Sequence, residues 1–384
     1  MIDYIEEKTM ERSTYALNDT ADLISPALIY YKDIILDNTK RIIEMAGGAE
    51  RLWPHVKSHK TAGMIKMQTG LGITRFKCAT IAEAEITAEA GAAHIILAYP
   101  LIGPNVSRFL HLAKAYPNVH FYAIGDDLDQ LAILSDEAGM METCVNFLVD
   151  VNLGMNRTGV PLNLLESFYE RASALKGISL KGMHCYDGHR KDHDLGERKA
   201  KAEEGDRQLL QIRDSLKQKG IECDIMVMGG SPSFPCRTGN PDFYLSPGTL
   251  FISDWAYSST LPDLDFPPGA VVFCRVVSHC GALSGAGNNF TLDLGSKGIA
   301  TDHPVEARGV IAGLPEARSV FQSEEHWVFS LPEKTPLPPI GSECYVIPAH
   351  ICPTSALYPD ILVAQGGKIT ETWPVSARNR KIRY

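Results

Sequence analysis

The sequence predicts an α/β protein, a (β/α)8 barrel followed by a smaller antiparallel β domain. Over residues 27–254, short apolar runs alternate with stretches of helical period, which is typical of buried parallel strands joined by helices. Over residues 255–384 the helical period fades, and short alternating runs separated by Pro and Gly indicate antiparallel strands. Residues 1–26 are expected to form an arm that packs on one of the two domains.

Eight apolar runs in the first region are interpreted as strands. They cover residues 27–31, 52–57, 75–79, 93–99, 119–125, 145–151, 178–186 and 223–230. Eight strands that alternate with helices favour a closed barrel over an open doubly wound sheet. The segment after the first run also opens with polar residues, whereas a dinucleotide-binding sheet would carry a glycine-rich loop there.

Composition and charge restrict the function. The net charge of -9 argues against binding to nucleic acid or to an anionic membrane, because basic surfaces drive both. The nine cysteines are an odd number at wide spacings without a Cys-x-x-Cys pair, which fits a reducing compartment. The N-terminus has no apolar signal segment, and no apolar run approaches the ~18 residues of a membrane span. We therefore expect a cytoplasmic enzyme.

Lys57 is the first residue with catalytic potential. It lies in WPHVKSHKT (53–61), at the carboxyl end of the second predicted strand, and the active sites of barrel enzymes lie at that end. A lysine there loses its proton readily, and only the neutral amine attacks a carbonyl to form a Schiff base. His55, two residues earlier in the strand, is expected on the same face. The alternative is a lysine paired with a carboxylate at the barrel rim.

Three loops that contain glycine follow later strands. Arg157 lies in VDVNLGMNRTGV (149–160) and could hold a carboxylate or phenolate by charge-assisted hydrogen bonds, the alternative being an exposed loop arginine. MGGSPSF (228–234) and SPGT (246–249) offer backbone N–H groups suited to phosphate, which barrels often bind after strands seven and eight. Ordinary Gly-Ser-Pro turns are the alternative for both segments.

His350 and Cys352 suggest a metal site. They lie two residues apart in PAHICPT (348–354), which is interpreted as a strand, so both side chains are expected on one face. Imidazole and thiolate together suit zinc. Two protein ligands leave coordination positions open for substrate and water, a pattern that suits catalysis. The alternative is a packed histidine and a buried free cysteine.

Together these segments resemble one family, the D-threonine aldolases and eukaryotic-type D-serine dehydratases, which are fold-type III pyridoxal-phosphate enzymes with an alanine-racemase-like N-terminal domain. The resemblance runs from about Pro26 to Arg380. It rests on PHVKSHKT, FKCATIAEAE, GMNRTG, GGSPS, SPGT with the following Asp254, and PAHICPT with TWPVSARNR.

The resemblance implies pyridoxal 5′-phosphate as the cofactor, with Lys57 carrying it as a Schiff base and His55 close to it. It also implies that Arg157 contacts the phenolic oxygen and that Tyr186, in HCYDGH, lies beside the pyridine ring. Four residues match the phosphate-binding turns, Gly230, Ser231, Gly248 and Thr249. His350 and Cys352 match the divalent-metal pair, for which zinc is the expected ion and manganese or magnesium are alternatives.

One position departs from the racemase relatives. They carry an arginine that contacts the pyridine nitrogen where this chain has Ser246, which argues against a simple alanine racemase. In the family, dehydratases tend to have His-x-Cys at the metal and aldolases His-x-Asp. Cys352 therefore favours dehydration of a D-3-hydroxy amino acid such as D-serine or D-threonine to a 2-oxo acid and ammonia.

Three alternatives remain open. A D-threonine aldolase would cleave its substrate to glycine and acetaldehyde, a metal-independent racemase would turn over alanine, and a non-enzymatic protein would only carry the cofactor. The large β domain with its metal pair counts against the last of these. By analogy with relatives, we expect a homodimer.

Overall fold

The computed structural model describes residues 10–279 and 287–384, and it divides into two compact units. The first unit contains residues 10–39 and 249–378 of the described chain, and the second contains residues 40–248 and 379–384. Helix α2 (Lys32–Ala46) runs from the first unit into the second. Among the described residues, no helix is both long and apolar enough to cross a membrane.

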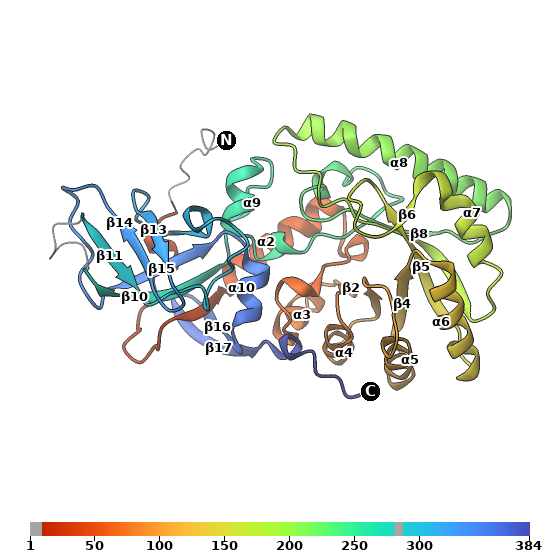
Figure 1. Cartoon of the computed structure of the whole chain (residues 1–384), viewed down its shortest axis with the longest axis horizontal. Helices are drawn as coiled ribbons and strands as arrows, with labels where there is room; N and C mark the ends of the chain where they lie inside the picture. The colour runs from red at the N-terminus through yellow and green to blue at the C-terminus, as the bar shows by residue number, and fades with distance from the viewer. Residues whose placement is uncertain (1–9, 280–286) are drawn as a thin grey trace. The chain divides into compact units, whose positions relative to one another are not determined.

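The second unit is a parallel barrel with helices on its outside (Figure 1). Its sheet has the order β2-β3-β4-β5-β7-β8-β9, and the short β6 pairs with β5. The strands are β2 (Arg75–Cys78), β3 (His94–Leu97), β4 (His120–Gly125), β5 (Val145–Asn152), β6 (Val160–Pro161), β7 (Ile178–Cys185), β8 (Ile225–Met228) and β9 (Tyr244–Leu245). The helices are α3 (Ala62–Thr69), α4 (Ile81–Glu89), α5 (Asn105–Ala115), α6 (Leu128–Met140), α7 (Leu162–Ala172) and α8 (Leu195–Gln218).

Residues 52–55 close the barrel between its first and last strands. Leu52 forms a parallel bridge with Leu245 in β9, and His55 forms one with Lys77 in β2. The backbone N–H of Trp53 donates to the carbonyl of Leu245 over 2.8 Å, and the N–H of Lys77 donates to the carbonyl of Pro54 over 2.8 Å. The predicted closed barrel is therefore confirmed, and residues 52–55 form part of its wall.

The barrel interior is filled by apolar and aromatic side chains below the carboxyl ends of the strands. The cluster consists of Trp53, Ile96, Tyr122, Ile124, Leu148 and Val227. Trp53 meets the ring of Tyr122 edge-on, with centroids 5.6 Å apart. Burial of each large side chain contributes about 1.5–3 kcal/mol to the free energy of folding, so this cluster stabilises the barrel.

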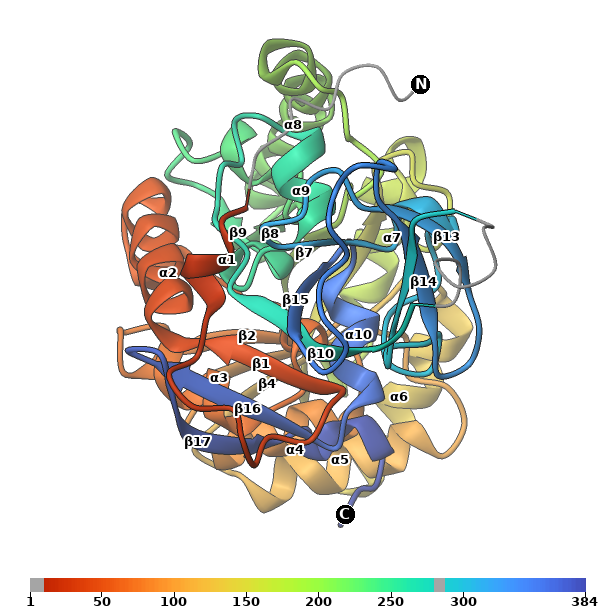
Figure 2. The ribbon, with the colours of Figure 1, turned by 90° about the vertical axis from the view of Figure 1, so that its left-hand side faces the viewer.

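The first unit is built on a nine-stranded sheet with the order β13-β14-β11-β10-β1-β16-β17, in which β15 pairs with β10 and β12 (Figure 2). Its pairs are antiparallel except for β1 with β16. The strands are β1 (Ala27–Tyr31), β10 (Ala270–Ser278), β11 (Asn289–Leu292), β12 (Gly309–Ile311), β13 (Arg318–Gln322), β14 (Trp327–Ser330), β15 (Glu343–Pro348), β16 (Asp360–Gln365) and β17 (Lys368–Pro374). The helices are α1 (Arg12–Tyr15), α9 (Trp255–Thr260) and α10 (Ile351–Leu357).

Strand β1 lies elsewhere than predicted. We predicted residues 27–31 as the first barrel strand, but they pair with β10 and β16 in the sheet of the first unit. A run that is apolar on both faces is compatible with the centre of either sheet, so its pattern does not identify its partners. The barrel instead gains β9, whose two residues are too short to give a sequence signal. The predicted boundaries 1–26, 27–254 and 255–384 thus differ from the two observed units.

The described part of the N-terminal arm, residues 10–26, packs within the first unit. Tyr15 and Leu17 are buried in a cluster with Tyr31, Phe273 and Tyr345. The hydroxyl of Tyr15 donates to the carbonyl of Pro268 over 2.9 Å. Residues 1–9 of the predicted arm lie outside the described residues.

Candidate functional site

A cavity of about 470 Å³ opens at the carboxyl ends of the barrel strands, and all of its walls belong to the second unit. Its size is typical of a site for a small molecule. The residues that line it are His55, Lys57, Ala79, Ala98, Tyr99, Pro100, Ile102, Ile124, Asp150, Val151, Met155, Arg157, Thr158, His184 and Tyr186. The four barrel residues predicted around the cofactor ring therefore share one cavity.

Lys57 lies in a single 3-10 turn (Val56–Ser58) directly after the segment that closes the barrel. We predicted that His55 and Lys57 would share a strand, but His55 caps this turn. Its Nδ1 accepts the backbone N–H of Lys57 over 3.4 Å. The turn changes the direction of the chain at the barrel rim. The side chains of His55 and Lys57 therefore both line the cavity because of this turn, and not because of their alternation along a strand.

The ring of Tyr186 is surrounded by three basic groups. Its centroid lies 5.7 Å from Nζ of Lys57, 5.4 Å from Nζ of Lys77 and 5.2 Å from Cζ of Arg157. Cations over an aromatic face are attracted by its quadrupole. The cavity therefore concentrates positive charge around one ring and is suited to an anionic ligand.

Burial lowers the pKa values of two bases in this region. Burial, followed by the charge of Lys57, lowers the pKa of His55 well below its ordinary value. Burial also lowers the pKa of Lys77 to about 7, with Lys57 as the next contribution. Both effects follow from the cost of a charge in a poorly solvated place that already holds other cations.

Asp150 and His184 form a buried pair on the cavity wall. Nδ1 of His184 lies 2.7 Å from Oδ1 of Asp150. Burial acts to raise the pKa of Asp150, but the hydrogen bond with His184 holds it below its ordinary value, while burial lowers the pKa of His184. Nε2 of His184 is buried and has no hydrogen-bond partner in the described chain. An orphaned polar atom in a cavity wall is expected to meet a ligand or a water molecule.

The predicted phosphate turns form a crowded backbone cradle. A Cβ on Gly230 would lie 2.7 Å from Cε2 of Tyr186, and one on Gly248 would lie 3.0 Å from Cβ of His55. A side chain at either position would force its neighbour to shift. The N–H of Gly248 donates to Oγ of Ser231 over 3.1 Å. Thr249 falls in the first unit, where its Oγ1 lies 3.3 Å from Sγ of Cys352.

A buried ion network holds the turn that contains Gly230. The guanidinium of Arg237 pairs with Asp187 over 2.8 Å and with Asp206 over 2.8 Å. Oγ of Ser233 donates to Asp187 over 2.5 Å and accepts the N–H of Gly230 over 3.3 Å. Asp187, next to Tyr186, therefore links the aromatic ring to the cradle.

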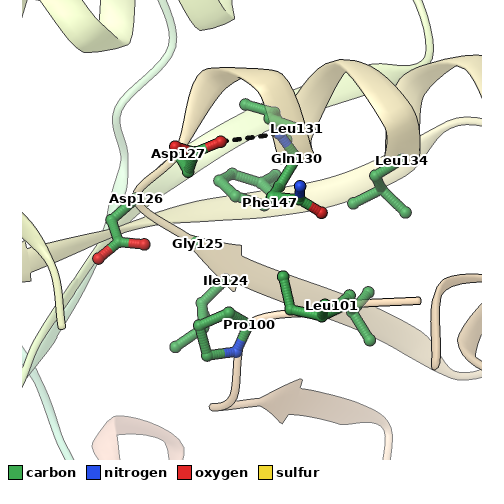
Figure 3. A pocket seen from close by; sticks show the side chains of 11 residues that line it. Pro100, Leu101, Ile124, Gly125, Asp126, Asp127, Gln130, Leu131, Leu134 and Phe147 are labelled. Carbon is green, nitrogen blue, oxygen red and sulfur yellow. Dashed lines mark hydrogen bonds between the residues drawn. The ribbon is translucent and has the colours of Figure 1, made fainter.

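The loop that carries Arg157 is anchored to the end of β4. Oδ2 of Asp126 accepts the N–H of Gly159 over 2.5 Å, and Gly159 has a φ of 105° that favours glycine. Figure 3 shows Asp126 beside Asp127, the N-cap of α6, at the edge of a second small cavity. That cavity measures about 40 Å³ and is lined largely by apolar side chains such as Leu131 and Phe147, so we assign it to packing.

The predicted metal pair lies at a helix start and not in a strand. His350 is the N-cap of α10 and Cys352 lies in its first turn. Burial acts to lower the pKa of His350, but its hydrogen bonds with Cys352 and Asp302 raise it to about 9. Its Nδ1 lies 2.5 Å from Oδ2 of Asp302. Ligand atoms of Asp302, His303 and His350 all lie within 4.8 Å of one another.

The site residues that the sequence analysis did not predict include Asp302, His303, Lys77, Asp150 and, in β7, His184. Asp302 and His303 lie in a loop far from His350 along the chain, so no local spacing relates them. Lys77 and Asp150 lie in segments that we interpreted only as barrel strands, where inward and outward positions alternate. A charged residue inside an apolar strand was the available signal, because such residues are rarely fully buried unless they are paired.

The closed barrel with a lysine at its carboxyl end, together with a separate antiparallel sheet, defines the alanine-racemase-like class of α/β barrels. The chain belongs to the family of the alanine racemase N-terminal domain, whose model matches residues 32–250. A second model, described as a putative serine dehydratase domain, matches residues 269–364. Both parts of the resemblance predicted from the sequence are thereby confirmed.

Relatives match most of the chain. D-threonine aldolase of an Arthrobacter species is 26% identical over 342 residues, which cover 85% of each chain. 3-Hydroxy-D-aspartate aldolase of Paracoccus denitrificans is 24% identical over 376 residues, which cover 94% of each. The crystal structure of D-threonine aldolase from Filomicrobium marinum superposes with a TM-score of 0.83 at 26% identity and covers 93% of this chain and 96% of its own.

Proposed function

We propose that this protein is a pyridoxal-phosphate-dependent, metal-assisted lyase that acts on D-3-hydroxy amino acids. Three observations support the proposal: the cationic cavity at the carboxyl end of the barrel, the cluster around His350, and the names of the similar proteins. The donor sets fit both groups. The cavity offers basic side chains and a glycine cradle to an anionic cofactor, and the cluster offers nitrogen, sulfur and oxygen donors to a metal.

In this proposal Lys57 would hold the cofactor covalently, Arg157 would contact its phenolic oxygen, Tyr186 would lie beside its ring, and His55 would lie close to it. Its phosphate is held by Gly230, Ser231, Gly248 and Thr249. When bound, pyridoxal phosphate supplies a sink for the electrons released at the substrate Cα. Lys57 is the proposed base that takes the Cα proton on its Nζ, which lies 5.7 Å from the centroid of the Tyr186 ring in the cavity.

His350 and Cys352 are the proposed metal ligands, with zinc as the expected ion and manganese or magnesium as alternatives. The metal would supply a Lewis acid for the substrate β-hydroxyl. Asp302 orients His350 through Nδ1, as carboxylates do for metal-binding histidines, and leaves Nε2 for the ion. His303 lies close enough to Asp302 and His350 to add a third ligand or to hold a proton near the hydroxyl.

Cys352 is the residue that favours dehydration over retro-aldol cleavage in this proposal. Its thiol lies beside His350 and Thr249, which supports the His-x-Cys pattern predicted for dehydration to a 2-oxo acid and ammonia. The second candidate is retro-aldol cleavage, which the names of the Arthrobacter and Paracoccus relatives favour. Racemisation is disfavoured at Ser246, whose hydroxyl donates to the carbonyl of Trp53 over 2.8 Å and so is committed to the barrel backbone.

The test is to incubate the protein, loaded with pyridoxal phosphate and zinc, with D-threonine and to identify the carbon products. 2-Oxobutyrate with ammonia is the expected result and supports dehydration. Glycine with acetaldehyde would establish the aldolase and show that Cys352 does not decide which bond breaks. L-allo-Threonine from D-threonine, the product of inversion at Cα alone, without either of the other products would establish a racemase. We also propose a cytoplasmic homodimer, which light scattering of the purified protein tests for its oligomeric state.

A further inference from the structure

Lys77 is a buried lysine below the cavity that the proposed chemistry does not use. It lies in β2 with 2% of its surface exposed. Its Cα is in register with that of Ile96 in β3, and it forms the bridge with His55 that closes the barrel. Lysine is rarely buried unless it is paired. Among the described residues, Lys77 makes no ion pair, so another reason for its burial is needed.

Another lysine of the same barrel shows the usual solution. Lys60 lies three residues after Lys57 and is also largely buried, with 16% of its side chain exposed. It forms an ion pair and hydrogen bond with Glu83 of α4, whose side chain is fully buried. Within the described ranges, the fold therefore provides a carboxylate for one buried lysine and none in direct contact for the other.

The acidic groups nearest to Lys77 are engaged elsewhere. Asp150 bonds to His184, and Asp187 is held by Arg237 and Ser233. The basic groups, in contrast, share its surroundings, since Lys57 and Arg157 flank the same Tyr186 ring. The ionisable groups that act on or face Lys77 are His55, Lys57, Asp150, Arg157, His184, Tyr186 and Asp187.

From this arrangement we infer that Lys77 is a positioning residue for the reaction: it places a second positive charge near the Tyr186 ring that Lys57 also approaches, and so favours the neutral, nucleophilic form of the Lys57 nitrogen. The inference deepens the proposed function and rests on it. Like charges close together in a poorly solvated place disfavour each other, and a neighbouring cation is an established way to activate a lysine.

The titration of Lys77 agrees with this role. Burial and the charge of Lys57 lower its pKa to about 7, so the two lysines disfavour each other's protons. A permanently neutral side chain at position 77 removes the repulsion and raises the proton affinity of Lys57. A permanently charged side chain preserves or increases the repulsion.

The test is a pH titration, in the protein loaded with pyridoxal phosphate, of the visible absorption of the cofactor bound to Lys57. The midpoint at which this nitrogen loses its proton should rise by about one pH unit in Lys77→Met. In Lys77→Arg it should stay at or below the wild-type value. Lys77→Gln replaces Lys77→Met if that variant does not fold. Lys181→Met is the control, because Lys181 pairs with Glu222 and does not line the cavity.

A midpoint in Lys77→Met or Lys77→Gln within 0.2 pH units of wild type, as a rough experimental limit, overturns the inference. So does a rise in Lys77→Arg equal to that in Lys77→Met, because loss of packing and not of charge would then be responsible. Failure of the proposed function looks different: wild-type protein with pyridoxal phosphate would show no visible band that depends on Lys57.

Discussion

The pKa values of basic groups shift downward around the barrel cavity and upward at His350 in the first unit. In the barrel, buried His55 and Lys77 lie among cations, and both pKa values fall. In the first unit, His350 is also partly buried, but its hydrogen bonds with Cys352 and Asp302 raise its pKa. Burial alone favours neutral bases, whereas acidic neighbours favour a positive charge. The first environment suits a nucleophilic amine, and the second suits a site in which a metal ion replaces the proton.

The largest expected effect comes from the amine itself. Lys57→Ala should abolish both the visible absorption of the bound cofactor and turnover of D-threonine, because no other lysine lines the cavity among its described walls. Spectra and product assays on the same preparation measure both. Full activity in this variant would remove the proposed mechanism. Lys181→Met serves as the control and should retain both signals, because Lys181 pairs with Glu222 and does not line the cavity.

Removal of the metal should be nearly as severe, and it should leave the barrel unaffected. Treatment with a chelator is expected to remove turnover, and zinc or cobalt should restore it, because the β-hydroxyl loses its Lewis acid. Cys352→Ala should show the same loss and weaker rescue. The visible band of the cofactor should persist throughout. An enzyme that keeps its rate in chelator contradicts the roles of His350 and Cys352.

Asp302 should have an intermediate effect. Asp302→Ala should weaken metal binding by about 10–100-fold, because His350 loses the carboxylate that orients its ring. Zinc titration followed by recovery of activity measures the change, and high zinc should restore most of the rate. Asp360→Ala, at the exposed start of β16, is a matched carboxylate control. Equal zinc affinities for Asp302→Ala and wild type would show that the contact is only structural.

The smallest expected effect is on stability. Burial lowers the pKa of His59 to about 3, and its Nδ1 accepts the N–H of Thr61 over 3.3 Å. The folded-state pKa lies below the unfolded value of about 6.5, so the unfolded state binds the proton first and stability falls as the pH drops below about 6.5. From pH 6.5 to 5 the loss for this one group is about 2 kcal/mol.

Urea unfolding of His59→Gln at the two pH values checks this prediction. The variant should lose less stability than wild type between pH 6.5 and 5, because its side chain binds no proton. His111→Gln, on the exposed face of α5, should behave like wild type. Identical pH dependence in His59→Gln and wild type would mean that this histidine stays neutral for both states or is protonated in both.

Much of the barrel could be predicted from the sequence because its strands are short apolar runs separated by helices of clear period. Lys57, Arg157 and Tyr186 were placed in the right region for that reason, since each follows or ends a predicted strand. The predictions were less accurate where the chain forms a short turn or begins a helix. His55 and His350 were predicted in strands, yet one caps a 3-10 turn and the other begins α10. Single turns are too short to produce a period in the sequence.

The sequence by itself determined three features: the change from alternating strands and helices to short antiparallel strands, the positions of the glycines in the crowded turns, and the chemical types of the candidate ligands. Each of these can be read from residues that are close together in the chain. Only the tertiary structure decided that β1 joins β10 and β16, that Asp302 meets His350, and that Lys77 faces the ring of Tyr186. Each of these pairings joins segments far apart in the chain. Burial and charge select these partners once the fold has formed, so local sequence patterns do not predict them.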